Sequence, residues 1–240
     1  SVDAILDFGE KGFPGILVET IAIFINNLAV PANTKVFSLT HRLHLTQPQA
    51  YIFDPELPYW IIYRNQLFDS VCRKLDFDVF EVFRDRQLTN KLLSSSGELR
   101  VLKSRNLSDD GKEILDIPGY DSYISYAAAK PLSVFQYLDA PNVYLTPNMT
   151  YKPRMMKKPP HCVVNGSLAI LIPKGGIVPT EKQLAYFSSE EYRAFYQIAR
   201  NFQTRSLNVD ACSVFFYGLL RDEAKPAPEK FDTSVQLSFL

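Results

Sequence analysis

The chain has 240 residues, of which 46% are apolar and 22% are charged, as in ordinary globular proteins with one large domain or two small ones. Its 26 basic and 26 acidic residues give a formal net charge of zero, which argues against a general polyanion binder. A DNA-binding module remains compatible with this balance, because a basic face can be offset by an acidic back. Three widely spaced cysteines without a C-x-x-C pair exclude a zinc cluster of the usual spacing, and His41 and His44 lack further ligands nearby.

The sequence predicts neither secretion nor membrane insertion. The apolar run 16–25 contains Glu19 and is too short to cross a bilayer, and the chain shows no signal-peptide pattern. We therefore expect a cytoplasmic protein with reduced, structural thiols.

The first 60 residues are dominated by strand patterns. Residues 2–8 form an apolar run, and after a Gly/Pro turn residues 16–25 predict a second strand or a buried helix. Continuous apolar strands of this kind belong inside a larger sheet. Residues 35–45 alternate apolar and polar side chains and predict one strand, and a Pro-rich connector follows at 47–58.

The pattern changes beyond this connector. Leu67, Val71 and Leu75 fall at helical spacing, and we place a domain boundary so that residues 1–60 and 61–240 form separate units. Further along, residues 98–106 predict a strand that ends in a turn. Residues 131–138 predict a short helix or strand.

A locally basic segment lies in the second half of the chain. No Asp or Glu occurs between Pro141 and Thr180, whereas five cations do: Lys152, Arg154, Lys157, Lys158 and Lys174. Clustered cations without interleaved acids are typical of a surface that meets phosphates. A solvated loop whose acids lie elsewhere explains the run about equally well.

Strong local signals follow this segment. The apolar run 162–172 contains Asn165-Gly166, the preferred two-residue hairpin turn, so a hairpin is predicted. Thr180 to Gln183 and Ser188 to Glu191 fit the capping box that opens a helix. An apolar stripe then predicts a packed helix face; it comprises Tyr192, Phe195, Tyr196, Ala199 and Phe202. Residues 213–219 predict a closing strand.

Phrases spread over much of the chain resemble a known family. LTPNMTYKPR, VVNGSLAILIP, LAYFSSEEYRAFYQIARNFQTRSLNVDACSVFFYGL and the earlier ILDFGEKGFPGILVETIAIFI are similar to the C-terminal region of type II restriction–modification adenine-N6 DNA methyltransferases. The arrangement is the one in which the catalytic domain precedes the target-recognition domain. The resemblance implies an α+β fold: mixed-sheet remnants of a catalytic domain in residues 1–60, then a DNA target-recognition domain in residues 61–240.

The resemblance also implies a partner and a set of contacts. Double-stranded DNA would be gripped through its phosphates by Arg84, Arg86, Arg100, Lys103, Lys152, Arg154, Lys157, Lys158 and Arg205. Arg105 and Asn106 are predicted to reach base edges, with Tyr151 a weaker candidate, because Arg and Asn suit guanine and adenine edges. On this division, Arg154→Ala weakens binding to all duplexes alike, and Asn106→Ala changes the preference between them. A turn-starting role for Asn106 is the more ordinary explanation of that residue.

The chemistry of methyl transfer is missing from this chain. It has no G-x-G-x-x-G loop, no P-loop and no G-x-S-x-G elbow, and the Asn-Pro-Pro-Tyr motif of the family is absent as well. S-adenosylmethionine is therefore implied only for the full-length enzyme, whose catalytic domain lies upstream, and no cofactor is expected here. The chain alone is predicted to be inactive.

Two other classes of function remain open. A scaffolding domain with a Tyr- and Phe-rich surface would bind protein instead of DNA. An unrecognised hydrolase is disfavoured because the chain has few histidines and no nucleophile signature. Salt dependence separates DNA binding from an apolar protein interface.

Overall fold

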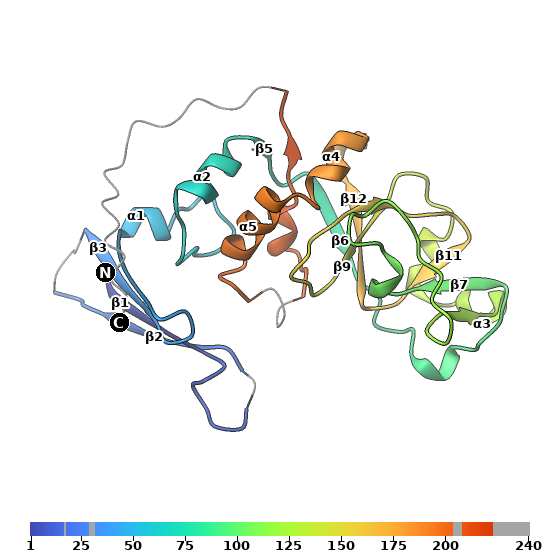
Figure 1. Ribbon diagram of the computed structural model, residues 1–240, viewed down its shortest axis with the longest axis horizontal. Coiled ribbons are helices and arrows are strands. Elements are labelled where there is room, and N and C mark those ends of the chain that lie inside the picture. The colour runs from blue at the N-terminus through green and yellow to red at the C-terminus, as the bar shows by residue number, and fades with distance from the viewer. Residues whose placement is uncertain (17, 29–31, 204–207, 223–240) are drawn as a thin grey trace.

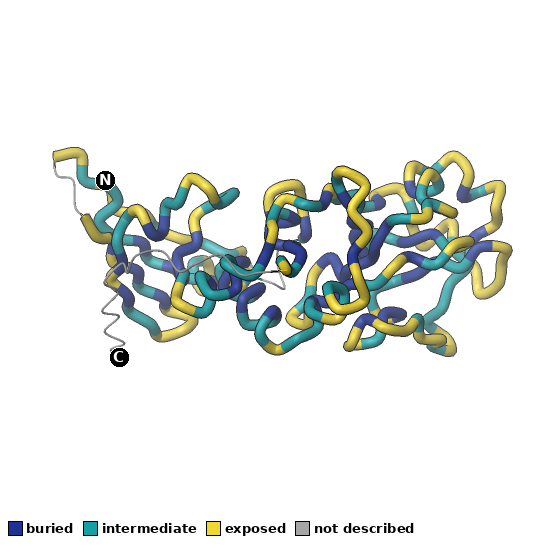
Figure 2. Tube along the Cα trace, turned by 90° about the horizontal axis from the view of Figure 1, so that it is seen from above, coloured by how far each residue is buried: buried dark blue, intermediate teal, exposed yellow. Residues whose placement is uncertain are grey.

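The computed structural model describes residues 1–16, 18–28, 32–203 and 208–222. These residues form an elongated molecule with a mixed α+β fold and four small sheets, so the predicted α+β class is confirmed. Three parts follow one another along its long axis, which we call the N-terminal sheet, the helical centre and the distal lobe (Figure 1). Buried residues run through the interior of these parts, and exposed residues gather at the turns (Figure 2).

The N-terminal sheet contains one parallel and two antiparallel strand pairs. Its strands are β1 (Val2–Gly9), β2 (Thr20–Ile25), β3 (Asn33–Ser38) and β4 (Leu43–Pro48), in the order β2-β1-β3-β4. β1 and β3 run parallel. Alternation along the strands places Ile5, Val36 and Leu45 on one face, where all three are buried in the larger hydrophobic core.

The structure corrects two predictions for this region. Residues 35–45 form parts of two strands, because the chain reverses at residues 39–42, where Arg42 adopts a positive φ. The apolar run 16–25 ends in β2, which lies at the edge of its sheet and not inside a larger one. Phe24 is 55% exposed and Ile25 is 67% exposed, so much of this apolar strand faces solvent.

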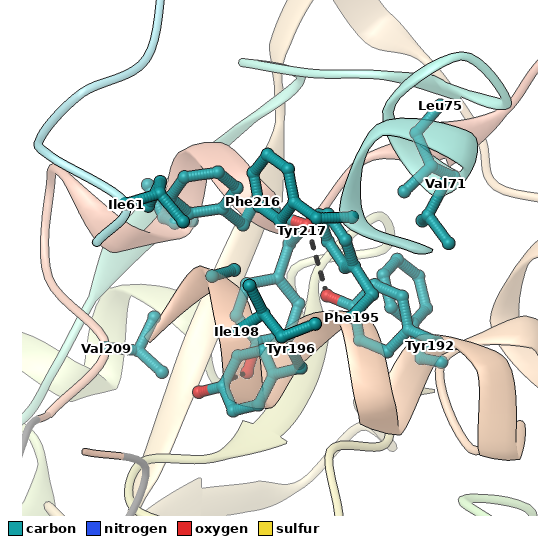
Figure 3. Close-up of a cluster of buried hydrophobic side chains, with 14 of the residues drawn as sticks. Ile61, Val71, Leu75, Tyr192, Phe195, Tyr196, Ile198, Val209, Phe216 and Tyr217 are labelled. Carbon is teal, nitrogen blue, oxygen red and sulfur yellow. Dashed lines mark hydrogen bonds between the residues drawn. The ribbon is translucent and has the colours of Figure 1, made fainter. Parts of the chain in front are cut away.

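The helical centre packs aromatic side chains into the larger core. It comprises α1 (Gln49–Ile52), α2 (Gln66–Cys72), β5 (Leu75–Asp76), α4 (Glu181–Tyr186), α5 (Glu190–Ala199), η5 (Ser213–Phe216) and β13 (Leu219–Leu220). Tyr192, Phe195 and Tyr196 of α5 are fully buried against Phe216 and Tyr217, as Figure 3 shows. Burying each such ring stabilises the fold by about 2–3 kcal/mol. The predicted apolar stripe is thus confirmed within α5.

The predicted closing strand at 213–219 is wrong. The segment forms a 3-10 turn, η5, and the two-residue strand β13. Val214, Phe216 and Tyr217 are all buried, so the run has no exposed face that a half-buried strand would show. A short apolar run does not distinguish these conformations.

The two predicted capping boxes have different outcomes. At α4 the box forms as predicted, since the Thr180 hydroxyl accepts from the Gln183 amide and the Gln183 side chain accepts from the Thr180 amide. At α5 the cap is Ser189, one residue later than predicted, and it accepts from the Tyr192 amide. Ser188 instead donates to the Ala185 carbonyl.

The distal lobe is built from two small sheets. One contains β10 (Met156–Lys157), β9 (Tyr144–Pro147), β12 (Leu168–Pro173) and β6 (Phe80–Phe83), and the other β11 (Cys162–Val164), β7 (Leu99–Leu102) and β8 (Ser122–Ile124). The connections contain η1 (Asn90–Leu92), η2 (Ser104–Asn106), α3 (Tyr126–Ala129), η3 (Ser133–Tyr137) and η4 (Lys174–Gly176).

The Asn165-Gly166 pair forms a turn but not a hairpin. The amide of Leu168 donates to the carbonyl of Asn165 at 3.0 Å, as the local sequence predicts. The strands on either side then enter different sheets, because β11 pairs with β7 whereas β12 pairs with β9 and β6. The hairpin prediction is therefore wrong, and long-range pairing is the reason.

Two hydrophobic cores divide the chain differently from the predicted boundary at residue 60. The larger core takes residues from both sides of it, including Ile5, Ile61 and Phe195. The smaller core belongs to the distal lobe and is lined by residues such as Val101 and Ile170. The chain enters this lobe on β6 and leaves on β12, where Phe80 pairs with Pro173.

No helix in the described part of the chain combines the length and the apolar character that crossing a bilayer requires.

Candidate nucleic-acid interface

Three loops that carry predicted contact residues, and a fourth that joins them, meet at one end of the distal lobe. We call them the converging loops, and they comprise residues 84–86, 103–106, 148–152 and 165–167. The last of these joins the others: the Asn148 side chain donates to the Gly166 carbonyl at 3.0 Å, and the Ser104 amide donates to the Ser167 hydroxyl at 2.9 Å. A Cβ on Gly166 would lie 2.8 Å from the carbonyl oxygen of Asp85, so the first loop touches it as well.

Strand register explains why these loops meet. Leu168 at the start of β12 pairs with Pro147 at the end of β9, and Ile170 pairs with Phe83 at the end of β6. In the other sheet, the last residues of β7 and β11 pair with each other. The carboxyl ends of four strands therefore deliver their loops to one place.

The central feature of these loops is the turn η2, which holds Arg105 and Asn106. Asn106 is fully buried, and its amide makes three hydrogen bonds inside the protein. Its oxygen accepts from the Lys103 amide at 2.9 Å, and its nitrogen donates to the Leu115 carbonyl at 3.0 Å and to the Asp121 carboxylate at 2.6 Å. The base-edge role predicted for Asn106 is therefore incompatible with this structure, because the whole side chain is used to shape the turn.

Arg154 holds the same turn from another side. It is 7% exposed, and its guanidinium donates to the carbonyls of Ser104 at 3.1 Å, Leu107 at 3.2 Å and Lys152 at 2.9 Å. Burial lowers the pKa of this guanidinium from its usual value. The phosphate contact predicted for Arg154 is corrected on the same ground, since none of the phosphates of a duplex could reach it without opening the turn.

Arg105 points outward from η2. It is exposed, and its guanidinium carbon lies 4.7 Å from the centroid of the Tyr120 ring. The Lys103 ammonium lies 3.8 Å from the same centroid and donates to the carbonyl of Tyr120 and, at 3.0 Å, to the hydroxyl of Ser122. Burial lowers the pKa of Lys103, and its bonds within the lobe leave it a poor phosphate ligand compared with Arg105.

Two further predicted phosphate contacts are occupied by protein groups. The Arg100 guanidinium donates to Asp116 at 2.6 Å and to Asp121 at 2.9 Å, and although burial opposes its charge, these carboxylates raise its pKa. Lys158 is 4% exposed, and its ammonium donates to the carbonyls of Leu138 and Pro159. Both assignments are therefore corrected to internal roles.

The remaining predicted DNA contacts differ in their exposure and in whether protein groups already bind their side chains. Arg86 and Lys157 are exposed and Arg84 is half-buried, and within the described residues the side chains of these three make no hydrogen bond or ion pair. Lys152 is exposed and forms an ion pair with Asp109, and Tyr151 is 49% exposed. Arg205 lies outside the described residues.

Acidic groups border the basic ones on one side. The hydrogen bond from Lys152 lowers the pKa of Asp109, so this carboxylate stays ionised at neutral pH. Next to it, a groove of about 430 Å³ is lined by Asp110, Lys112, Met155, Lys157, Glu181 and Leu184. Lys157 therefore sits beside the converging loops among charges of both signs.

Sequence reasoning missed two residues that shape the site, Tyr120 and Asp121. Tyr120 contacts both neighbouring cations, and Asp121 accepts from Asn106, Arg100 and the Ile117 amide. They come from a loop about 15 residues downstream of η2, and no local pattern pointed to them.

The loop after β1 is rich in glycine, but a Cβ on Gly9 or Gly12 would meet the side chain of Thr40 or Thr20, so the protein itself fills this loop. S-adenosylmethionine therefore does not fit there. No group of three or more metal-binding side chains exists in the part of the chain that the structure describes.

Comparison of the sequence with known protein families and with curated proteins finds no match.

Proposed function

We propose that this chain is the DNA target-recognition region of a type II adenine-N6 DNA methyltransferase. The observation that carries the proposal is the meeting of three basic loops around the turn 165–167 at one end of the distal lobe, where Arg84, Arg86, Arg105 and Lys152 are brought onto neighbouring segments. Flexible cations on several loops grip phosphates, whereas a fixed side chain among them can read a base. This chain's part is to hold the duplex and choose the sequence.

The N-terminal sheet is proposed to be the last part of the catalytic domain of the full-length enzyme. Parallel strands such as β1 and β3 normally belong to sheets covered on both faces. One face here is buried, but a groove of about 380 Å³ on the other is lined by apolar side chains that include Leu6, Phe24, Phe37 and Leu39. An upstream catalytic domain that packs on this face would complete the coverage.

The distribution of aromatic residues bears on the scaffold alternative. The largest aromatic cluster lies inside the helical centre and not on a surface. Exposed apolar side chains occur at both ends of the molecule: Phe13, Ile21 and Phe24 belong to the N-terminal sheet and its loop, and Leu92, Tyr126 and Met149 to the distal lobe (Figure 1). The apolar groove on the N-terminal sheet supports a protein contact there, which an upstream domain of the same polypeptide would supply.

Salt-dependent selection of DNA tests the proposal. The chain is titrated with a random duplex pool at two salt concentrations, and the retained DNA is sequenced. Three to five phosphate contacts predict a slope of about −3 to −4.5 for log affinity against log salt. Enrichment of a short motif is expected among the retained duplexes.

Two variants sharpen this test. Arg86→Ala should make the slope shallower by about one contact, whereas Lys35→Ala, an exposed cation on β3, should leave it unchanged. Absence of binding at low salt, or binding that is insensitive to salt, would overturn the proposal.

A further inference from the structure

The backbone of η2 is fixed more completely than a surface turn requires. The Ser104 amide donates to the Ser167 hydroxyl, and the Ser104 carbonyl accepts from Arg154. The Leu107 carbonyl also accepts from Arg154, and the Asn106 carbonyl accepts from the Leu115 amide at 2.7 Å. Partners from three separate segments therefore clamp one turn of three residues.

The cation in this clamp, Arg154, is buried and donates only to backbone carbonyl groups. Each hydrogen bond that the Arg154 guanidinium makes is to a backbone carbonyl, and its Nε has no partner among the described residues. Burying a charge without a hydrogen-bonded carboxylate costs free energy, and a 3-10 turn closes without such help. The gain from this arrangement is a turn with a single backbone geometry.

One exposed side chain benefits from that geometry. Arg105 is the exposed residue of η2, and the aromatic ring of Tyr120 lies against its guanidinium. A guanidinium that lies over a ring is held in place there, and its planar fork of N–H groups matches two acceptors at once. Guanine presents such a pair in the major groove, O6 and N7, and is the usual partner of Arg there.

We propose that Arg105 reads one guanine of the target, and that Arg154 and Ser167 are positioning residues that fix the turn from which it reads. The inference rests on the proposed function, since it names the base that one residue of this DNA-binding surface selects. Within the part of the chain that the structure describes, the side chains of Arg84 and Arg86 on the neighbouring loop have no such clamp, and we assign them to phosphates. Asn106 shapes the same turn without touching DNA.

Selection from a random duplex pool tests the proposal at single-position resolution. The wild-type chain should enrich a motif that contains a guanine. Arg105→Ala should lose about 10- to 100-fold of the discrimination at that position and keep the other positions. Arg105→Lys should also lose it, because a lysine supplies a point charge and no fork. Arg86→Ala, the matched control, should weaken all duplexes alike and keep the motif.

A positioning role for Arg154 predicts a loss of base discrimination at one position, which a general loss of stability would not produce. Arg154→Lys should reduce discrimination at the same position as Arg105→Ala, while its affinity for the unselected pool at low salt and its circular dichroism stay near the wild-type values. Ser167→Ala, which removes the bond to the Ser104 amide, is a second variant for the case that Arg154→Lys does not fold. Loss of discrimination at every position, in either variant, would contradict the positioning role.

The outcomes separate this inference from the function on which it rests. A wild-type chain that binds no duplex overturns both. A wild-type chain that selects a motif, together with an Arg105→Ala variant that selects the same motif, overturns only the assignment of Arg105.

Discussion

Replacing Asn106 with alanine is expected to destabilise the distal lobe instead of merely altering its preference for DNA. The side chain is fully buried and makes three hydrogen bonds, to the Lys103 amide, the Leu115 carbonyl and the Asp121 carboxylate. Alanine removes all three bonds; the Leu115 carbonyl keeps its bond from Arg100, and Asp121 keeps its bonds from Arg100 and the Ile117 amide. The same substitution at an exposed base-reading residue would barely affect stability.

The size of the effect follows from these partners. Each lost neutral hydrogen bond costs about 1 kcal/mol, and the bond to the carboxylate costs about 1.5–3 kcal/mol. The expected decrease in the free energy of unfolding is therefore about 3–5 kcal/mol. For a chain of this size it corresponds to a decrease in Tm of roughly 10 °C.

Urea unfolding followed by circular dichroism measures this decrease. Arg105→Ala, one residue away but exposed, is the control and should change the free energy of unfolding by less than about 0.5 kcal/mol. A loss below about 1 kcal/mol in Asn106→Ala would refute the reasoning, because it would mean that the buried amide network does not hold the turn.

Two further predictions concern titratable groups. Burial raises the pKa of Tyr59 to about 12 and also raises the pKa values of Tyr192 and Tyr217, so above pH 10 these phenols ionise in the unfolded chain but not in the folded one. Stability should therefore be intact below pH 10 and fall as pH rises beyond it, by up to about 1.4 kcal/mol per pH unit for each of these tyrosines. The last part of the rise in absorbance at 295 nm should coincide with the loss of circular dichroism, and ionisation of all 13 tyrosines in a protein that is still folded would contradict this. Among the thiols, Cys212 is exposed, whereas burial raises the pKa of Cys72 to about 12 and also that of Cys162. Ellman's reagent at pH 8 should find one fast thiol, and a fast phase that persists in Cys212→Ser would show that a buried thiol is accessible.

Local features of the fold could be predicted from the sequence. The box from Thr180 to Gln183 involves residues three apart, so it needs nothing beyond its own segment. The turn at Asn165-Gly166 formed for the same reason. The sheet that each flanking strand joins depends on residues far away in the sequence. Val163, for example, pairs with Val101, more than 60 positions upstream, and no local pattern encodes this pairing.

Sequence reasoning selected segments that the structure brings together, but it did not predict what their side chains contact. Sequence reasoning selected the segments that contain Arg105 and Arg154, and the structure places them together. It did not distinguish an exposed arginine from a buried one, because the partners of Arg154 include carbonyls almost 50 residues away. The phosphate contact predicted for Lys158 was wrong for the same reason, because the carbonyl that its ammonium binds, that of Leu138, lies 20 residues upstream.

The attachment of the distal lobe has a consequence for how such proteins can change. Its chain enters and leaves through Phe80 and Pro173, which are paired neighbours on adjacent strands. Two crossovers at this point would exchange the small core and all four converging loops, and with them Tyr144, Met155, Ala169 and Leu171, which pack in the larger core. On the proposed function, a lineage could acquire a new target sequence in one recombination event, between relatives whose side chains match at these larger-core positions.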